Sequence, residues 1–335
     1  MNRPVPRPRR PRTPVEARAL RAVGPALLLV TTLAACGGSA DPGGAPAAIP
    51  PAADTTTTAP GEPGGPDAAG PVRYVALGDS YSAGAGIDPV APGSGGCFRS
   101  TRNYPHQLAE RLDLGLADAT CSGATSEDLL AGAVAGDLPE LGPRTRLVTL
   151  SIGGNDGGLF TQLLGSCARY AATDPTGSPC EAAIRDRTTE VLDEIDDNVG
   201  AVIDAVVDRA PRARVVVVGY PALLPDSGPG CPDVLPVAAG DVAFIAGVNT
   251  DLSAALEWAA RAADVEFLDV ATPSRGHDIC AATPWVNGLD PAEGDGIPVH
   301  PRLVEQTAVA DLLADLLADP PTDPPAAREG GRRGR

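Results

Sequence analysis

Short apolar runs and helical patterns alternate along the middle of the chain. Runs rich in Val, Ile and Leu that are bounded by turn residues predict β-strands. These runs lie at residues 72–77, 146–152, 214–218 and 265–270. Apolar residues three and four positions apart predict helices at residues 104–114, 184–209, 242–263 and 302–317. Because continuously apolar strands separated by helices favour a mostly parallel sheet covered on both faces, we expect an α/β, three-layer sandwich.

The predicted helix at residues 184–209 has the most regular pattern. Its apolar side chains fall on one stripe, and acidic residues occupy the other face. The stripe consists of Val191, Leu192, Ile195, Val199, Val202, Ile203 and Val206. We therefore expect the stripe to be buried and the acidic face to be solvated.

Residues suited to chemistry follow two of the predicted strands. Ser80 ends a Gly-Asp-Ser segment after the first strand, and Asn155 lies in Gly-Gly-Asn-Asp after the strand at 146–152. In a doubly wound sheet, reactive groups gather just beyond the carboxyl ends of the strands. Taken alone, Ser80 is equally consistent with a helix cap, and Asn155 with a turn. Between them lies Gly123, where no side chain keeps the backbone N–H from approaching a ligand closely.

The chain has three histidines. His300 lies in Pro-Val-His-Pro, immediately before the last predicted helix. A lone histidine in a loop is more often solvated than catalytic, and we expect this of His106 and His277. The place of His300 before the last predicted helix keeps it as a candidate for chemistry.

In this order and spacing, these segments resemble the SGNH (GDSL) hydrolase family, in particular the secreted, three-disulfide lipases and esterases of high-GC Gram-positive bacteria. The resemblance covers about residues 72–318 and includes Trp-Val-Asn-Gly at 285–288. It implies a flavodoxin-like sheet and a carboxylic ester hydrolase. The chain has no Gly-x-Ser-x-Gly segment, which is the signature of the α/β-hydrolase alternative.

The resemblance also implies the roles of the site residues. Ser80 is then the nucleophile and His300 the general base, while the backbone N–H groups of Ser80 and Gly123 and the side chain of Asn155 form the oxyanion hole. Serine is a poor nucleophile until a base takes its proton, and charge developing on the carbonyl oxygen needs donors already in place. No His or carboxylate cluster has metal-ligand spacing, so we expect neither a metal nor a cofactor.

One departure from the family pattern concerns the group that orients His300. Many members carry Asp three residues before the histidine, where this chain has Ile297. Two alternatives remain: the carboxylate of Asp295, or a backbone carbonyl, which we expect to be that of Ile297. A carbonyl fixes the imidazole tautomer but stabilises the cation less than a carboxylate does. We expect Asp79 and Asp156 to tie loops together by hydrogen bonds.

The resemblance favours a lipid-like acyl ester as substrate, cleaved through an acyl-enzyme on Ser80. Leu159, Phe160 and Trp285 are candidate contacts for the acyl chain, with packing in the core as the alternative. Two other functions stay open: an O-acetylesterase of polysaccharides, and a non-catalytic surface lipoprotein that binds a glycan or a lipid.

The charge balance excludes one class of partner. The chain has 26 basic residues, all Arg, against 43 acidic ones, for a formal charge of -17. Because a polyanion is repelled by such a protein, we expect no nucleic-acid partner. Apolar residues make up 43% of the chain, enough for a substantial core, and we expect a monomer.

The amino-terminal segment indicates export. Residues 1–22 contain seven Arg and one acid, and the apolar run that follows has roughly half the length needed to cross a bilayer. The run ends in Leu-Ala-Ala-Cys at 33–36, which resembles the bacterial lipobox, so we expect lipidation of Cys36. The expected divisions are a lipoprotein signal peptide (1–35), a disordered Gly/Pro/Thr-rich tether (36–71), the hydrolase domain (72–318) and a disordered tail (319–335). The protein is then extracellular, tethered to the outer face of the membrane or secreted.

The other six cysteines form an even set, which in an exported protein is consistent with three disulfides. Sequence alone permits 15 pairings. Pairing of nearest neighbours closes the shortest loops and is the one we expect. It joins Cys97 to Cys121, Cys167 to Cys180 and Cys231 to Cys280.

Overall fold

The computed structural model describes residues 74–136, 138 and 141–319. The expected signal peptide, the lipidation site at Cys36 and the tether at 36–71 lie outside the described residues, as does nearly all of the expected tail at 319–335. Among the helices that are described, none combines the length and the hydropathy needed to cross a membrane.

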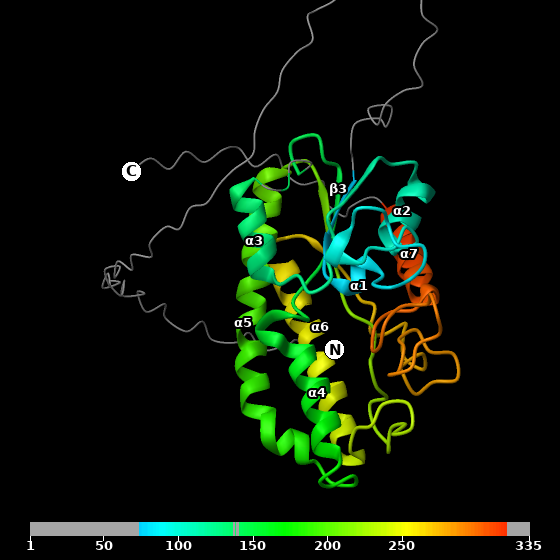
Figure 1. The fold of residues 1–335 in the computed structure, drawn as a ribbon. Coiled ribbons are helices and arrows are strands. Elements are labelled where there is room, and N and C mark those ends of the chain that lie inside the picture. Colours follow the sequence, from blue (N-terminus) through cyan, green and yellow to red (C-terminus); the bar gives the residue numbers. More distant parts are fainter. Residues whose placement is uncertain (1–73, 137, 139–140, 320–335) are drawn as a thin grey trace, which may run out of the picture. The chain divides into compact units, whose positions relative to one another are not determined.

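Five parallel strands form the sheet, in the order β2-β1-β3-β4-β5 (Figure 1). This is the flavodoxin-like order, in which the direction of strand addition reverses between β1 and β3. The four strands predicted from the sequence are present, and the three-residue edge strand β2 was missed. The strands are β1 (Tyr74–Gly78), β2 (Leu116–Asp118), β3 (Leu147–Ser151), β4 (Arg214–Val218) and β5 (Glu266–Leu268).

Helices cover both faces of the sheet, so the expected α/β three-layer sandwich is confirmed (Figure 1). Alternate residues of β1 belong to the two cores: Tyr74 packs with α2 and α7, whereas Val75 packs with α3, α5 and α6. The helices are α1 (Ser80–Ala83), α2 (Tyr104–Leu112), α3 (Ser126–Ala135), α4 (Leu159–Ala171), α5 (Pro179–Arg209), α6 (Val242–Ala262) and α7 (Leu303–Ala318). Three short 3-10 turns are η2 (Gly95–Cys97), η3 (Asp156–Gly158) and η4 (Ala239–Asp241).

Helix α5 begins five residues earlier than its apolar stripe predicts. Pro179 occupies the first turn, where its missing N–H costs no hydrogen bond. The carboxylate of Asp241 accepts the next two N–H groups, those of Cys180 (3.0 Å) and Glu181 (2.9 Å). The cap therefore comes from a residue about 60 positions away in the sequence. Most of the predicted stripe is buried, as expected, with Leu192 partly exposed.

The three disulfides have the nearest-neighbour pairing: Cys97–Cys121, Cys167–Cys180 and Cys231–Cys280. The second joins the end of α4 to the start of α5. The other two join loops at the carboxyl ends of the strands, the first linking η2 to the loop after β2. Two of the three crosslinks thus lie at the edge where the sequence places the reactive residues.

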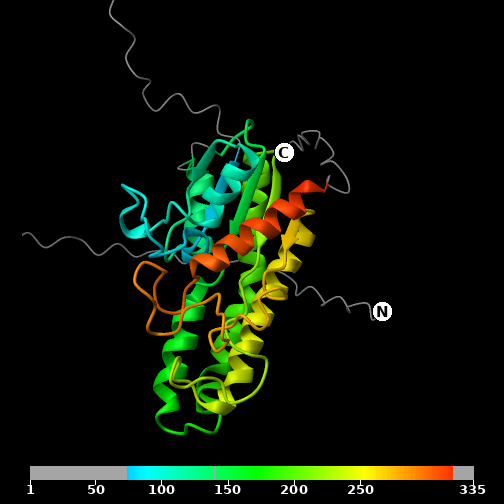
Figure 2. The same cartoon turned by 90° about the vertical axis from the view of Figure 1, so that its right-hand side faces the viewer.

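The long loop between β5 and α7 returns to the start of the chain. In the view turned by 90°, this loop (orange) lies beside the loop after α1 (cyan) (Figure 2). Ile87 forms an isolated antiparallel bridge with Asp295, and the N–H of Gly296 donates to the carbonyl of Gly86 at 3.3 Å. This contact brings the loop before α7, which contains His300, toward the end of β1.

Candidate active site

The candidate residues meet at the carboxyl ends of β1, β2 and β3. Ser80 opens α1 two residues after β1, Gly123 lies in the loop after β2, and Asn155 follows β3. His300 comes from the loop that precedes α7. The site therefore lies at the edge where strand order reverses, which is where doubly wound sheets bind their ligands.

Ser80 and His300, 220 positions apart, are in hydrogen-bond contact. The distance from Ser80 Oγ to His300 Nε2 is 2.9 Å. Ser80 is held by the short helix α1, which Asp79 caps by accepting the N–H of Tyr81 at 2.9 Å. Only glycine fits at position 78, because φ is +155° and a Cβ would lie 2.7 Å from the carbonyl oxygen of Ser151.

A backbone carbonyl faces His300 Nδ1, which is one of the two alternatives expected, but it is that of Pro298, so the choice of Ile297 was wrong, as was Asp295. The distance from His300 Nδ1 to the Pro298 oxygen is 2.7 Å. Val299 has φ +57°, in the left-handed region, and this turn aims the Pro298 carbonyl at the ring. The Ile297 carbonyl instead accepts the backbone N–H of His300 at 3.2 Å.

Asp295 is committed to the start of α7. Its carboxylate accepts the N–H of Leu303 at 2.7 Å and the Nε–H of Arg302 at 2.8 Å. Both bonds hold the helix that follows His300: one satisfies a helix-terminal donor, and the other pairs two partly exposed charges. Asp295 therefore supports the histidine loop without facing the imidazole.

The environment of His300 favours its neutral form. Burial lowers the pKa of the imidazole, and the hydrogen bond to Pro298 opposes this only in part. Because a carbonyl oxygen can only accept, Nδ1 carries the proton and Nε2 presents its lone pair to the Ser80 hydroxyl. The ring also packs against Tyr81, with 5.4 Å between centroids. The arrangement is that of a general base held in one tautomer.

We expect this lowered pKa to be visible in a titration of the ring. Because burial destabilises the imidazolium, His300 must titrate with a midpoint below 6.5, the ordinary value for histidine. Nitrogen chemical shifts measured by NMR across the acid range report this midpoint directly. Loss of the signal in the His300→Gln variant assigns it among the three histidines. A midpoint at or above 6.5 would contradict this account of the ring.

Three potential oxyanion donors lie on the segments that follow the carboxyl ends of β1, β2 and β3. Within the part of the chain that the structure describes, the backbone N–H groups of Ser80 and Gly123 have no hydrogen-bond partner. Gly123 has φ +82° with open space where a Cβ would stand. The side-chain amide of Asn155 donates one hydrogen to the carbonyl of Ala124 at 3.0 Å. Its second amide hydrogen is left for a ligand.

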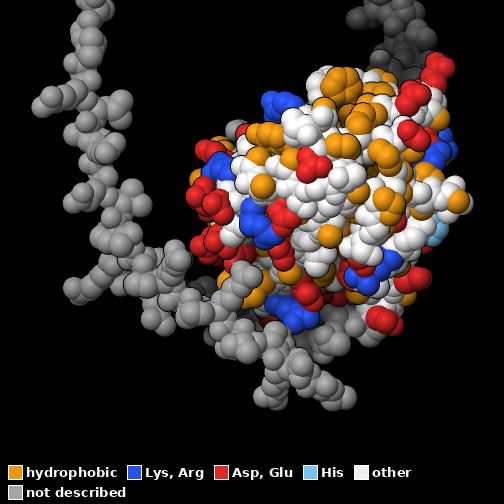
Figure 3. Space-filling view, turned by 90° about the horizontal axis from the view of Figure 1, so that it is seen from below, with side chains coloured by type: hydrophobic (Ala, Val, Ile, Leu, Met, Phe, Trp, Pro, Cys, Tyr) orange, Lys and Arg blue, Asp and Glu red, His pale blue; other side chains and the backbone are white. Residues whose placement is uncertain are grey.

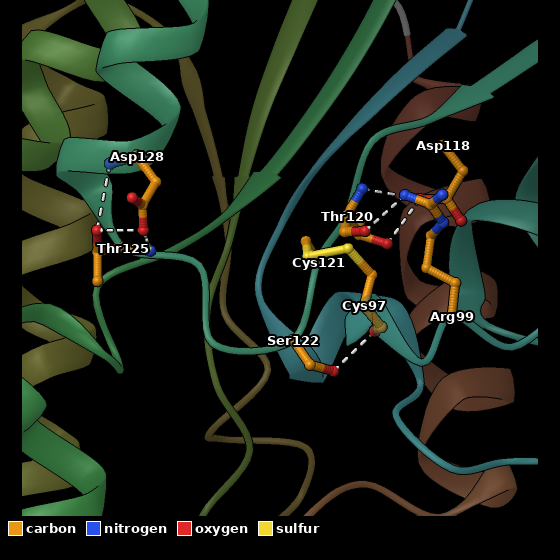
Figure 4. Close-up of a disulfide and its surroundings, with 8 residues drawn as sticks. All are labelled: Cys97, Arg99, Asp118, Thr120, Cys121, Ser122, Thr125 and Asp128. Carbon is orange, nitrogen blue, oxygen red and sulfur yellow. Dashed lines mark hydrogen bonds between the residues drawn. A yellow bond between two sulfur atoms is a disulfide. The ribbon is translucent and has the colours of Figure 1, made fainter. Parts of the chain in front are cut away.

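The loop that carries Gly123 is fixed on both sides. Before it, Cys121 is bonded to Cys97, and the Ser122 hydroxyl donates to the Cys97 carbonyl at 2.8 Å (Figure 4). After it, Thr125 caps α3 in a reciprocal arrangement with Asp128 (Figure 4). These constraints hold the N–H of Gly123 in place before any substrate arrives.

Asp79 and Asp156 tie loops together, in the arrangement that the sequence suggested. Asp79 receives the Tyr220 hydroxyl at 2.6 Å, and burial raises the pKa of Asp79 to about 7 although that bond opposes the shift. Asp156 accepts the N–H of Ser126 at 2.8 Å and so joins the β3–α4 loop to α3. Burial raises the pKa of Asp156 as well.

Three residues that hold the site were not identified from the sequence. Tyr81 donates its hydroxyl to the Val299 carbonyl at 2.8 Å and so fixes the histidine loop. Gln306, on α7, donates to the Tyr81 carbonyl at 2.8 Å. Tyr220, which follows β4, links the loops after β1 and β3. A lone Tyr or Gln shows no characteristic spacing in the sequence. The one signal that could have pointed to any of the three is the position of Tyr220 just after a predicted strand.

Two of the three side chains that were candidates for contact with the acyl chain pack in the core instead. Leu159 is 3% exposed and Phe160 8% exposed, and both belong to the core, which is the alternative that the sequence left open. Trp285 is half-buried and stacks on His277 at 5.0 Å. It lines a groove of about 570 Å³ together with Arg102 and the start of α7. The structure therefore does not bring these three side chains together around Ser80.

The two other histidines are engaged in structural hydrogen bonds. His277 Nδ1 lies 2.7 Å from the Thr283 carbonyl, and His106 Nδ1 lies 2.7 Å from Asn103 Oδ1. His106, which was expected to be solvated, is in addition 3.4 Å from Asp118. Within residues 74–136, 138 and 141–319, no group of three or more His, Cys, Asp or Glu side chains is arranged to hold a metal ion.

Comparison with known proteins identifies the family of the chain. The model of the GDSL-like Lipase/Acylhydrolase family matches residues 76–303. Lipase 2 of Streptomyces coelicolor is 39% identical over 251 residues, which cover 71% of this chain and 83% of that protein. Lipase 1 of the same organism is 34% identical over 218 residues, covering 65% and 76%.

Two solved structures are similar over nearly their whole length. Phospholipase A1 from Streptomyces albidoflavus NA297 has a TM-score of 0.62 at 27% identity, covering 73% of this chain and 99% of that one. The extracellular lipase from Streptomyces rimosus has a TM-score of 0.60 at 29% identity, with the same coverage. The fold is thus shared with proteins named as a phospholipase A1 and a lipase.

Proposed function

Because the chain belongs to the GDSL-like lipase/acylhydrolase family and is a carboxylic ester hydrolase, we propose that it cleaves lipid-like acyl esters through an acyl-enzyme on Ser80. One observation carries the proposal: Ser80 Oγ lies 2.9 Å from His300 Nε2, and the other ring nitrogen is fixed by a carbonyl. This is the nucleophile, base and orienting group that acyl transfer requires.

The reaction proceeds in two halves. His300 Nε2 takes the proton of the Ser80 hydroxyl as Oγ attacks the ester carbonyl carbon. The negative charge that develops on the carbonyl oxygen meets the N–H groups of Ser80 and Gly123 and the amide of Asn155. His300 then returns the proton to the leaving alcohol, and a water molecule, deprotonated by the same ring, releases the acid from Ser80.

The Pro298 carbonyl replaces the carboxylate of a Ser-His-Asp triad. It holds the tautomer that leaves Nε2 free to accept, so the orienting role is retained. As a neutral dipole it stabilises the imidazolium less than an aspartate does. The lowered pKa of His300 agrees with this, because among the described residues no carboxylate raises it.

Two features support an apolar substrate. Proteins similar to this chain are named lipase and phospholipase A1. Exposed apolar side chains also stand on loops at the carboxyl edge, including Phe98, 52% exposed beside the Cys97–Cys121 disulfide, and Leu289, 48% exposed. Figure 3, which looks at the molecule from below the view of Figure 1, shows hydrophobic side chains interspersed with charged and other polar ones.

A series of p-nitrophenyl esters tests the substrate class. We expect kcat/KM to rise from acetate through butyrate to octanoate and palmitate, with the Ser80→Ala variant as the background. Activity confined to acetate would favour the polysaccharide O-acetylesterase instead. Absence of hydrolysis across the series, by folded and oxidised protein, would favour a non-catalytic lipoprotein.

We further propose that the protein is exported and anchored by a lipid on Cys36. Three disulfides support an oxidising compartment. In a detergent phase separation of protein made in a Gram-positive host, we expect the wild type in the detergent phase and the Cys36→Ser variant in the aqueous phase. A wild-type chain whose first residue, by mass spectrometry, is not a diacylglyceryl cysteine would refute the anchor.

A further inference from the structure

Tyr220 is fully buried beside the nucleophile turn. It lies two residues after β4, and its ring packs edge-on against Tyr81 at 5.2 Å and against Phe160 at 5.3 Å. These two contacts leave the ring one orientation, with its hydroxyl directed at the loops after β1 and β3. Because the side chain has no exposed surface, Tyr220 does not touch the substrate.

The Tyr220 hydroxyl joins the two loops that carry the proposed chemistry. It donates to Asp79 Oδ2 at 2.6 Å and accepts the backbone N–H of Gly154 at 2.9 Å. Asp79 directly precedes Ser80, and Gly154 directly precedes Asn155. One hydroxyl therefore connects the turn of the nucleophile with the turn of a proposed oxyanion donor.

Both ends of this connection are held tightly. The second carboxylate oxygen of Asp79 accepts the N–H of Tyr81 at 2.9 Å, so the carboxylate cannot turn away. At Gly154, a Cβ would lie 2.6 Å from the ring of Phe160 and 3.1 Å from the Tyr220 oxygen. The loop can approach the hydroxyl only because this residue has no side chain.

We propose that Tyr220 is a positioning residue for ester hydrolysis, its hydroxyl setting the distance between the Ser80 turn and the Asn155 side chain. The inference rests on the proposed roles of Ser80 and Asn155. An oxyanion hole works because its donors are in place before charge develops. Without the hydroxyl, the β3–α4 loop is no longer bonded to the nucleophile turn. The transition state is then stabilised less, while the affinity for the substrate is nearly unchanged.

The Tyr220→Phe variant tests this role while keeping the ring contacts. We expect kcat to fall about 10-fold to 100-fold, the size of effect that small misplacements of catalytic groups produce, with KM nearly unchanged. The rate of labelling by a fluorophosphonate, whose phosphoryl oxygen occupies the same hole, should fall with kcat. The matched control is Tyr74→Phe, since Tyr74 is equally buried and its hydroxyl bonds to Thr149 at 2.8 Å on the other face of the sheet. Both variants should lose thermal stability, and only Tyr220→Phe should lose turnover.

Asp79→Asn supplies a second test should Tyr220→Phe fail to fold. An asparagine keeps an oxygen for the N–H of Tyr81 but turns its NH2 toward the Tyr220 hydroxyl, which then faces two donors and has no acceptor. We expect Asp79→Asn to lose kcat to the extent expected of Tyr220→Phe. Where Tyr220→Phe does fold, the double variant should be hardly worse than either single one, because both substitutions break the same connection.

The outcomes separate this inference from the function on which it rests. If wild-type hydrolysis does not depend on Ser80, the proposed function fails. If the wild type hydrolyses esters through Ser80 but Tyr220→Phe keeps its kcat, or Tyr74→Phe loses as much, only the role of Tyr220 is refuted. A double variant whose loss is the product of the two single losses would also refute it.

Discussion

Replacing Ser80 by Ala should reduce kcat for any ester substrate by roughly 10⁴-fold to 10⁶-fold, the scale seen when serine hydrolases lose their nucleophile. The substitution removes one oxygen that lies 2.9 Å from His300 and leaves the cap from Asp79 to α1 intact. Thermal stability should therefore stay close to that of the wild type. Steady-state kinetics on a butyrate ester, with the melting temperature measured in parallel, check both expectations.

Ser82→Ala is the matched control. Ser82 lies one half-turn away on the same short helix and is also buried, with its hydroxyl 3.0 Å from that of Tyr104. Loss of this hydroxyl removes a structural hydrogen bond, so turnover should change little while stability falls by about 1 kcal/mol. Turnover lost in Ser82→Ala and kept in Ser80→Ala would show that the assignment of the nucleophile is wrong.

Asn155→Ala should lower kcat by about 100-fold to 1,000-fold with little change in KM, because a donor to the oxyanion acts mainly in the transition state. One amide hydrogen of Asn155 is already given to the Ala124 carbonyl at 3.0 Å, which fixes the direction of the second. The measurement is kcat and KM for the same butyrate ester.

Asn155→Asp sharpens this test. The carboxylate has the size of the amide but offers no donor and carries negative charge, so it repels the developing oxyanion. We expect it to be less active than Asn155→Ala. An aspartate variant that is as active as the wild type would exclude Asn155 from the oxyanion hole.

Much of the fold follows from local patterns in the chain. The strands β1, β3 and β4 are short apolar runs buried on both faces, which favours a parallel sheet covered by helices on both sides, and β5 is a partly buried run at its edge. Two of the missed elements lack such a signal: the edge strand β2 has three half-buried residues, and α3 contains glycine and small residues that blur the helical period. Helix α4 does carry the signal, because its buried residues Leu159, Phe160, Leu163 and Cys167 recur at helical spacing, but it was not predicted from the sequence.

Ser80 and Asn155 could be singled out because each follows a predicted strand, and His300 because it precedes the last predicted helix. Gly123 follows the missed strand β2, so its role rested on the family resemblance. Which carbonyl orients His300 could not. It depends on the left-handed turn at Val299, a β-branched residue for which positive φ is uncommon. The hydrogen bond from the Leu303 N–H to the Asp295 carboxylate likewise depends on the folded conformation of the loop and could not be read from the sequence.

Hydrogen bonds between residues that are distant in the chain also could not be predicted from the sequence. Tyr220 and Asp79 are 141 positions apart, and Gln306 lies 225 positions from Tyr81. Each contact depends on how β4 and α7 pack beside β1. A single buried polar residue forms no repeating pattern in the sequence. Its hydrogen-bond partner can therefore be identified only from the packed structure.

The most direct test of the central claim is the site of reaction with a fluorophosphonate. The folded, oxidised protein should form one covalent adduct, and peptide mapping by mass spectrometry should place it on Ser80, because only a serine activated by a base reacts at a useful rate. The adduct should be absent in Ser80→Ala and strongly slowed in His300→Gln. An adduct on another residue, or no adduct on the wild-type protein, would contradict the account.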